Sequence, residues 1–237
     1  MQFDLAFMEP NPLVEVHFRL LKAHVRTYGP LGRWITFDPI TQMVHAVLDG
    51  RTREDISKRA FRKLCWRFTS WDDLRHVSPD AIAYLIQPVT FADNKAAQIS
   101  AALHRIHYLR GALSLDFLAG YSVEAARAWL EALPGVGPKV SAAVVNFSTL
   151  GMPALVVDSH YQRIAKRLGV VASKASDRAV DRSLARLVPG WMTTDDLQQN
   201  YFLVKRHGQT VCHHSPNCRV CVLKDLCLFG RRRCDGF

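Results

Sequence analysis

The sequence lacks a long uninterrupted hydrophobic run. No stretch of its 237 residues comes near the roughly 18 apolar residues that suggest a membrane-spanning helix. The first residues, MQFDLAFMEPNP, also lack the basic leader and the extended apolar segment of a secretory signal peptide. Both absences argue against a membrane or exported protein and predict a protein of the cytoplasm.

Acidic residues are in short supply. Asp and Glu number 21 against 31 Lys and Arg, which gives a formal net charge of +10 with neutral His. This excess favours a polyanionic partner, most simply nucleic acid, because Lys and Arg release counterions when they neutralise phosphates. The apolar fraction of 49% and the length allow a sizeable core in one large or two ordinary domains.

Paired strand patterns are missing as well. The short apolar stretch PALVV at 153–157 has no partner, whereas helical spacing recurs along most of the chain. Apolar residues three or four apart predict helices in AAQISAALHRIHYL and in SHYQRIAKRLGVV, the second of which should end at Gly169. Ser122 should begin a further helix over 122–133. The pattern predicts an all-α protein.

Cysteine is scarce until the last fifth of the chain, which holds five of the six. The remaining one, Cys65, lies in a helical pattern and is expected in the core. Four cysteines are spaced C-x5-C-x2-C-x5-C, namely Cys212, Cys218, Cys221 and Cys227. Disulfides are unexpected in a chain without an export signal, so this spacing predicts a four-thiolate metal site.

Two metal groups accept four cysteines, a [4Fe-4S] cluster and zinc. Structural zinc sites usually pair two short C-x2-4-C knuckles, whereas only the central pair is tight here. A compact loop around a larger object therefore favours the [4Fe-4S] cluster. His213 and His214 lie inside the loop and keep a mixed-ligand zinc site as the alternative.

The stretch LPGVGPK at 133–139 predicts a hairpin between two helices. Gly135 and Gly137 are typical of a tight turn that needs positive φ, with Val136 filling the apolar gap between the helices. Pro138 is then the expected first residue of the next helix. The amides of such a turn, together with the positive end of the helix dipole, form a seat for one DNA backbone phosphate.

Lys139 should lie in the first turn of that helix. A cation there opposes the helix dipole, which favours the neutral amine that a Schiff-base nucleophile requires. The alternative is an ordinary phosphate-binding lysine. Asp158 stands nineteen residues on, where it could be a simple N-cap. A return loop could also bring the two helix starts together and place this carboxylate beside the amine.

The three motifs LPGVGPK, VDSH and the four-cysteine loop, in this order, resemble the helix-hairpin-helix DNA glycosylases of the endonuclease III type. The resemblance runs from about residue 30 to the last of the four cysteines. It implies a two-lobed all-α fold with DNA in the cleft between the lobes. A six-helix lobe is expected at 32–150, and a cluster lobe at 1–31 and 151–237 with its Fe–S loop at 212–227.

The resemblance also implies an activity. Lys139 matches the family's Schiff-base lysine and Asp158 its catalytic aspartate, so the expected protein removes a damaged base and then cleaves the abasic site. Oxidised pyrimidines in double-stranded DNA are the expected substrates, and a monomer in the cytoplasm, at the nucleoid, is expected. One alternative is the same scaffold specialised for uracil, thymine mismatches or alkylated bases. Another is a non-catalytic Fe–S protein that binds DNA or senses redox state.

Further positions match residues that contact DNA in similar enzymes. Arg51 stands where they have a glutamine that enters the helix, and this departure leaves the preferred partner base open. Phe91 stands at the place of an apolar wedge, with a core aromatic as the alternative. His160 should approach the DNA backbone or pack inside the protein. Ala46 replaces the glutamate of mismatch-adenine glycosylases, which argues against that activity.

Overall fold

The structure is a computed structural model that describes residues 11–32 and 34–234. Across these residues the regular secondary structure is helical, and the β-type pairing is limited to an isolated bridge between Phe37 and Ser148. The all-α prediction is therefore confirmed. Most of the N-terminal stretch considered for a signal peptide lies outside the described residues. None of the described helices is both long and apolar enough to cross a membrane.

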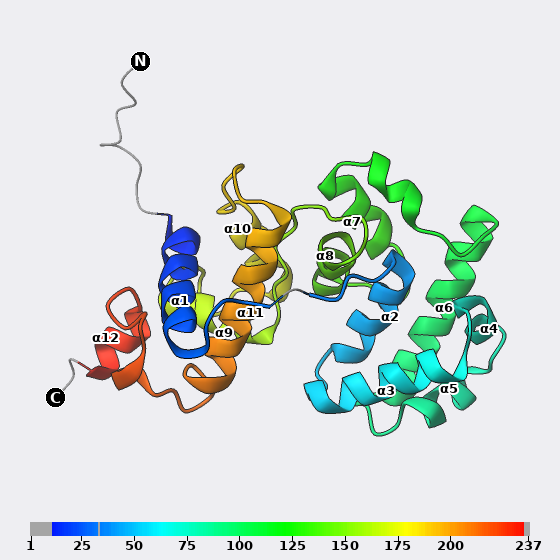
Figure 1. Cartoon of the computed structure of the whole chain (residues 1–237), viewed down its shortest axis with the longest axis horizontal. Helices are drawn as coiled ribbons and strands as arrows, with labels where there is room; N and C mark the ends of the chain where they lie inside the picture. The colour runs from blue at the N-terminus through cyan, green and yellow to red at the C-terminus, as the bar shows by residue number, and fades with distance from the viewer. Residues whose placement is uncertain (1–10, 33, 235–237) are drawn as a thin grey trace, which may run out of the picture. The chain divides into compact units, whose positions relative to one another are not determined.

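The helices follow one another along the chain and are joined by turns and loops (Figure 1). Their bounds are α1 Pro12–Tyr28, α2 Pro39–Asp49, α3 Glu54–Arg67, α4 Trp71–Arg75, α5 Pro79–Ile86, α6 Ala92–Arg110, α7 Val123–Glu131, α8 Pro138–Phe147, α9 Ser159–Leu168, α10 Asp177–Ala185, α11 Thr194–Thr210 and α12 Leu228–Cys234. Two short 3₁₀ helices accompany them, η2 Asp116–Gly120 and η3 Cys218–Val220.

The chain divides into two compact units. One contains the residues up to Trp34 together with those from Leu155 onward, and the other contains Ile35–Ala154. We call them the terminal unit and the central unit. The central unit holds α2 to α8, and its bounds differ by three and four residues from the lobe expected at 32–150. That the two units flank a DNA duplex stays a prediction.

Several helix boundaries follow from local signals in the sequence. The Ser122 hydroxyl accepts a hydrogen bond from the Ala125 amide at 3.2 Å and caps α7, as predicted. Gly169 ends α9 with φ at +87°, and a Cβ on this residue would collide with the Leu228 side chain. Glycine is therefore required at this C-cap by both its backbone conformation and its contact.

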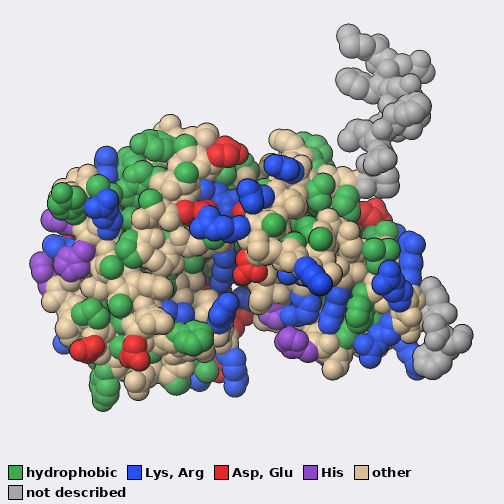
Figure 2. All heavy atoms as spheres, turned by 180° about the vertical axis from the view of Figure 1, so that it is seen from behind, with side chains coloured by type: hydrophobic (Ala, Val, Ile, Leu, Met, Phe, Trp, Pro, Cys, Tyr) green, Lys and Arg blue, Asp and Glu red, His purple; other side chains and the backbone are tan. Residues whose placement is uncertain are grey.

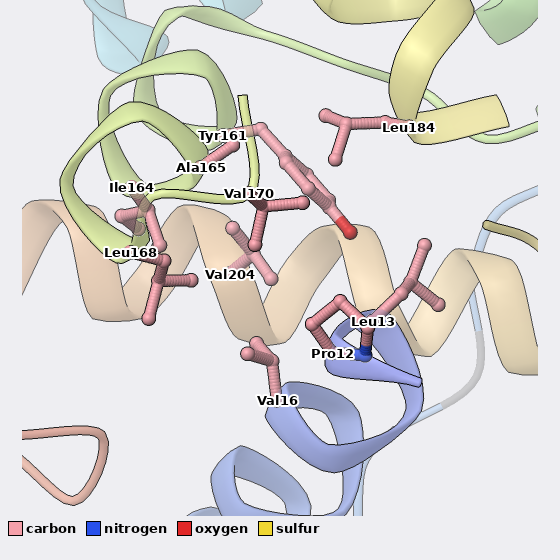
Figure 3. A pocket seen from close by; sticks show the side chains of 10 residues that line it. All are labelled: Pro12, Leu13, Val16, Tyr161, Ile164, Ala165, Leu168, Val170, Leu184 and Val204. Atoms are coloured by element: carbon pink, nitrogen blue, oxygen red, sulfur yellow. The ribbon is translucent and has the colours of Figure 1, made fainter. Parts of the chain in front are cut away.

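The apolar core of the terminal unit fixes α9. In Figure 3 side chains of α1, α9 and α11, among them Val16, Ile164 and Val204, meet around a small apolar hollow. Tyr161 lies at its edge, and its hydroxyl donates to Asn200 Oδ1 at 2.7 Å. Because Tyr161 is in the first turn of α9, this packing also fixes the start of the helix, where Asp158 lies.

The central unit is built on α2 and α8, which pack against each other. Most of their buried side chains are apolar, with Met43, Leu48 and Val144 no more than 1% exposed, and the polar Gln42, Ser141 and Asn146 are buried among them. The prediction for Cys65 is wrong, because its thiol lies on the exposed side of α3. Figure 2 shows Lys and Arg side chains spread over the face in view, as the net charge indicated.

Candidate active site

The hairpin between α7 and α8 forms as the glycines indicated, with one difference. Gly135 has φ at +75°, and a Cβ there would lie 2.6 Å from Gln98 Cβ, so a side chain is excluded twice. Gly137 has φ at −102° and is the N-cap of α8, so the expectation of positive φ is wrong at this glycine. Val136 is buried between the helices, and Pro138 is the first residue of α8.

The start of α8 has free capacity for an anion. Its N-cap, Gly137, has no side chain to accept a hydrogen bond from the first turn. The amides of Lys139 and Val140 therefore belong to the group that has no partner within a helix. These donors and the positive end of the helix dipole together favour a phosphate.

Lys139 lies beside a carboxylate of the same unit. Its Nζ is 2.6 Å from Oδ2 of Asp49, the last residue of α2. The side chains are only 24% and 18% exposed, so this is a partly buried ion pair. The packing of α2 on α8 brings the two residues together, although they are 90 positions apart in the chain.

A second lysine lies close to this pair. The Lys95 side chain is buried, and its amine donates to the carbonyl oxygens of Leu48, at 2.9 Å, and Gly50, and to the Thr52 hydroxyl at 2.8 Å. Burial lowers the pKa of Lys95 to about 8, and the nearby charge of Lys139 acts in the same direction. The Asp49 carboxylate opposes both effects. Lys95 thus holds the end of α2, where Asp49 lies.

Arg51 and Phe91 share an unusual backbone conformation. Their φ values of +52° and +58° mark them as the non-glycine residues with positive φ in the described chain. Phe91 is 58% exposed, so the alternative of a core aromatic is wrong. Lys95 links the two positions, because its amine binds the oxygens flanking Arg51 and its backbone amide donates to Phe91 O at 3.0 Å. Strained residues of this kind often lie at functional sites.

Asp158 is the N-cap of α9, and its Oδ1 accepts a hydrogen bond from the Tyr161 amide at 2.8 Å. It belongs to the terminal unit, whereas Lys139 belongs to the central unit, so their meeting stays a prediction. His160 packs against Gly208, and its Nδ1 lies 3.0 Å from the Arg163 guanidinium. Burial lowers the pKa of His160, and the Asp158 carboxylate opposes this effect. Its contact with DNA also stays a prediction.

The four cysteines of the C-terminal loop line one hollow, together with Arg167 and Lys224. All four are free thiols. Burial raises the pKa of Cys221 to about 11, and the neighbouring thiols add to this effect. Among the described residues no three His, Cys, Asp or Glu side chains form a group that could hold a single metal ion.

The donor set of this loop fits a cluster with four thiolate ligands. Arg167 Nη1 lies 3.2 Å from Cys212 Sγ, and the Gly230 amide donates to Cys227 Sγ at 3.3 Å. A guanidinium and an amide aimed at sulfur stabilise negative charge on the ligands of an iron–sulfur cluster. Sulfur chemistry and the shared hollow are therefore both compatible with a [4Fe-4S] group.

The chain matches a known family. Residues 44–190, more than half of the chain, match the model described as HhH-GPD superfamily base excision DNA repair protein. The chain belongs to this superfamily. The matched part of this HhH-GPD protein includes the hairpin, Lys139 and Asp158, and it ends before the four-cysteine loop.

Individual relatives and a solved structure agree with this membership. Endonuclease III of Thermotoga maritima is 31% identical over 202 residues, which cover 84% of this chain and 87% of that protein. An Arabidopsis thaliana protein named as a DNA glycosylase is 34% identical over 183 residues, 77% of this chain but 59% of the plant protein. The structure of a trapped endonuclease III–DNA covalent intermediate has a TM-score of 0.73 at 22% identity, covering 93% and 98% of the two chains, and shares the fold.

Two residues of the site were not predicted from the sequence, Asp49 and Lys95. A signal was available for Lys95, since it precedes Ile99 by four residues and so lies on the apolar face of α6. A lysine on a buried face needs acceptors, which indicates a structural or functional contact. Asp49 gave a weaker signal, an acidic residue at the end of a helix, where the dipole disfavours it.

Proposed function

We propose that this protein is a base-excision-repair DNA glycosylase that also cleaves the strand at the resulting abasic site through a Schiff base. The proposal rests above all on the placement of Lys139, directly after a glycine hairpin and at a helix start whose N-cap, Gly137, has no side-chain acceptor. The endonuclease III relatives support the same reaction. Damaged double-stranded DNA is the substrate, and oxidised pyrimidines are the class of base that we propose.

The Lys139 amine is the nucleophile of the proposed reaction. Its lone pair forms a bond to the sugar C1′, while the bond between C1′ and the damaged base breaks and its electron pair leaves on the base. Asp158 stabilises the positive charge that develops on the sugar. A proton then moves from nitrogen to the ring oxygen O4′, the C1′–O4′ bond breaks, and the nitrogen pair forms the C=N bond of the Schiff base. The Schiff base makes the C2′ proton acidic, and loss of this proton expels the 3′ phosphate.

The damaged base must leave the helical stack before it can react, which costs a few kcal/mol. We propose that Arg51 and Phe91 fill the space that the base leaves behind. An aromatic ring at Phe91 can stack between bases, and the Arg51 guanidinium can donate to an unpaired base edge. The left-handed backbone and the exposure of Phe91 support this role. Gly135, Val136 and Gly137 hold the backbone phosphate, and His160 approaches the DNA backbone from the terminal unit.

We assign a [4Fe-4S] cluster to the loop at 212–227, with Cys212, Cys218, Cys221 and Cys227 as ligands. When bound, the cluster supplies a structural cross-link that fixes the loop and the adjacent Lys224 for phosphate contact. Four irons per purified chain, lost in Cys221→Ser, test the assignment, and stoichiometric zinc would overturn it. Since one chain contains every residue named in the reaction, we propose a monomer that acts on the DNA of the nucleoid, in the cytoplasm.

Borohydride trapping tests the catalytic proposal. Sodium borohydride reduces a Schiff base to a stable amine, so incubation with an abasic duplex should give a covalent protein–DNA adduct. Lys139→Ala should abolish the adduct. Lys63→Ala is the matched control, since Lys63 lies over the Tyr84 ring in the same unit, and it should retain the adduct.

The outcomes separate the alternatives. DNA binding without any adduct would overturn the catalytic proposal and favour a non-catalytic iron–sulfur protein. Duplexes with single defined lesions then identify the base. Excision of thymine glycol or a similar oxidised pyrimidine is expected. Preferential excision of uracil, mismatched thymine or an alkylated base would overturn the substrate class while retaining the reaction.

A further inference from the structure

The ion pair between Asp49 and Lys139 is unusual because each charge opposes its own helix. Asp49 is the last residue of α2, where the helix dipole disfavours an anion, and Lys139 is in the first turn of α8, where it disfavours a cation. The stability of α2 therefore does not explain the presence of Asp49, and the stability of α8 does not explain that of Lys139. Each charge is compensated by the other, at 2.6 Å.

The surroundings fix the carboxylate more firmly than the amine. Lys95 ties down the end of α2 through Leu48 O and Gly50 O, so the backbone of Asp49 has little freedom. Lys139 has a long side chain that can rotate away from α2. The amine can therefore leave the carboxylate and reach a substrate, while the carboxylate stays in place.

We propose that Asp49 is the proton acceptor that generates the neutral amine of Lys139. This inference rests on the proposed function and assigns a role to a carboxylate of the central unit, separate from Asp158. In the first step a proton moves from Lys139 Nζ to Asp49 Oδ2, and the electron pair of the broken N–H bond stays on nitrogen. That pair is the nucleophile.

In the reaction with an abasic site, the proton that Asp49 accepts is later returned. The neutral amine adds to the C1′ aldehyde, and a proton shift from nitrogen to oxygen gives a carbinolamine. The proton held by Asp49 then joins the hydroxyl, which leaves as water as the nitrogen pair forms the C=N bond. Ammonium and aldehyde thus become an iminium and one water, and Asp49 returns to its carboxylate form.

Other titratable groups near the start of α8 are less suited to this step. Lys95, from α6, is a cation whose amine already donates to three oxygens. Arg127, from α7, donates to Ser141 Oγ and to the Pro138 carbonyl. The Glu131 carboxylate, also from α7, accepts a hydrogen bond from Ser141 Oγ at 2.8 Å. The Lys139 amine itself contacts Asp49.

A purely electrostatic role of Asp49 predicts the opposite result of a mutation. If the carboxylate only held the amine in its protonated form, its removal would free the amine and accelerate the reaction. If it accepts the proton, its removal slows the reaction. The sign of the rate change therefore decides between the two roles.

The experiment measures borohydride trapping on a preformed abasic duplex, with enzyme in excess, from pH 6 to pH 9.5. Asp49→Asn should trap about 100-fold more slowly than the wild type at pH 7, the usual contribution of an acid–base group. The difference should shrink as the pH rises, because solvent base then replaces the carboxylate as the proton acceptor. Asp49→Glu should recover most of the rate, and binding of the duplex, measured by fluorescence anisotropy, should be unchanged.

Controls distinguish this inference from a folding defect. Asp72→Asn removes an exposed carboxylate that pairs with Arg75 in the same unit, and it should trap at the wild-type rate. Should Asp49→Asn fail to fold, Asp49→Ala with added formate replaces it, and formate should restore the rate.

Three outcomes would overturn the inference: an unchanged rate, a faster rate, or a loss that is the same at every pH. An adduct formed by the wild type in any of these cases would leave the proposed function intact. Absence of an adduct in the wild type would instead contradict the proposed function itself.

Discussion

The starts of α8 and α9 differ in what satisfies their first backbone amides. At α9 the Asp158 side chain accepts a hydrogen bond from the Tyr161 amide and closes the helix start from within the protein. At α8 the N-cap is Gly137, which offers no side-chain acceptor, and a cation follows in the first turn. The start of α9 is therefore capped by a side chain of the protein, whereas a bound anion would stabilise the start of α8.

This difference separates two kinds of functional residue. Asp158 has a structural role that would account for it without any reaction, since Asp is among the best N-caps. Lys139 has no such account in its own helix, because a cation in the first turn opposes the helix dipole. The structural cost at α8 is therefore the stronger indication of a DNA contact.

The largest expected effect separates the two roles of Asp158. Asp158→Ser keeps an N-cap but removes the carboxylate, so base excision should fall by about 10³-fold while unfolding changes little. Asp158→Ala should lose the cap as well, at a cost of about 1 kcal/mol in the free energy of unfolding. Single-turnover excision and urea unfolding measure the two effects.

Ser176→Ala is the matched control for Asp158. Ser176 caps α10 in the same unit, and its loss should lower stability by about 1 kcal/mol without changing excision. Normal excision by Asp158→Ser would mean that Asp158 is a cap and no more.

The second prediction concerns Lys95, which holds the α2 end beside the α8 start. Its pKa is about 8 in the folded state and 10.5 in a model compound, so between these values the unfolded chain binds more protons. Stability contributed by Lys95 should therefore rise with pH across this window, by about 1.4 kcal/mol for each pH unit. The measurement is the difference in unfolding free energy between wild type and Lys95→Met from pH 7 to pH 10.5.

Lys63→Met provides the control for Lys95, since Lys63 lies over the Tyr84 ring at the surface. The difference in unfolding free energy between Lys63→Met and the wild type should not change between pH 7 and pH 10.5. If the difference in unfolding free energy between the wild type and Lys95→Met is also independent of pH, the buried amine keeps an ordinary pKa. The acceptors around it would then compensate for its burial.

The smallest expected effect is also the most direct comparison of the two helix starts. Gly137→Ser gives α8 the side-chain cap that α9 already has, so the protein should gain about 0.3 kcal/mol in unfolding free energy. The new hydroxyl occupies amides that we assign to a phosphate, so DNA should bind several-fold more weakly. A stabilised variant with unchanged DNA affinity would contradict the phosphate seat.

Much of the fold was predictable because its signals are local. The helical periodicity, the cap at Ser122 and the stop at Gly169 depend on residues within a turn or two of each other. The exposure of Cys65 was not predictable in this way, because a cysteine in a helix gives no indication of which face is covered. The conformation of Gly137 shows the same limit, since an N-cap glycine and a left-handed glycine look alike in a sequence.

The sequence by itself determined the all-α class, the hairpin at 133–139 and the candidate nucleophile Lys139, because turn glycines, helix caps and apolar periodicity act over short distances. Only the tertiary structure placed Asp49 at Lys139, and the Lys95 amine at Leu48 and Gly50. Those pairs come from different helices, and their contact depends on how α2, α6 and α8 pack. Packing of side chains far apart in the chain has no local signature, which is why the contact between Lys139 and Asp49 became visible only in three dimensions.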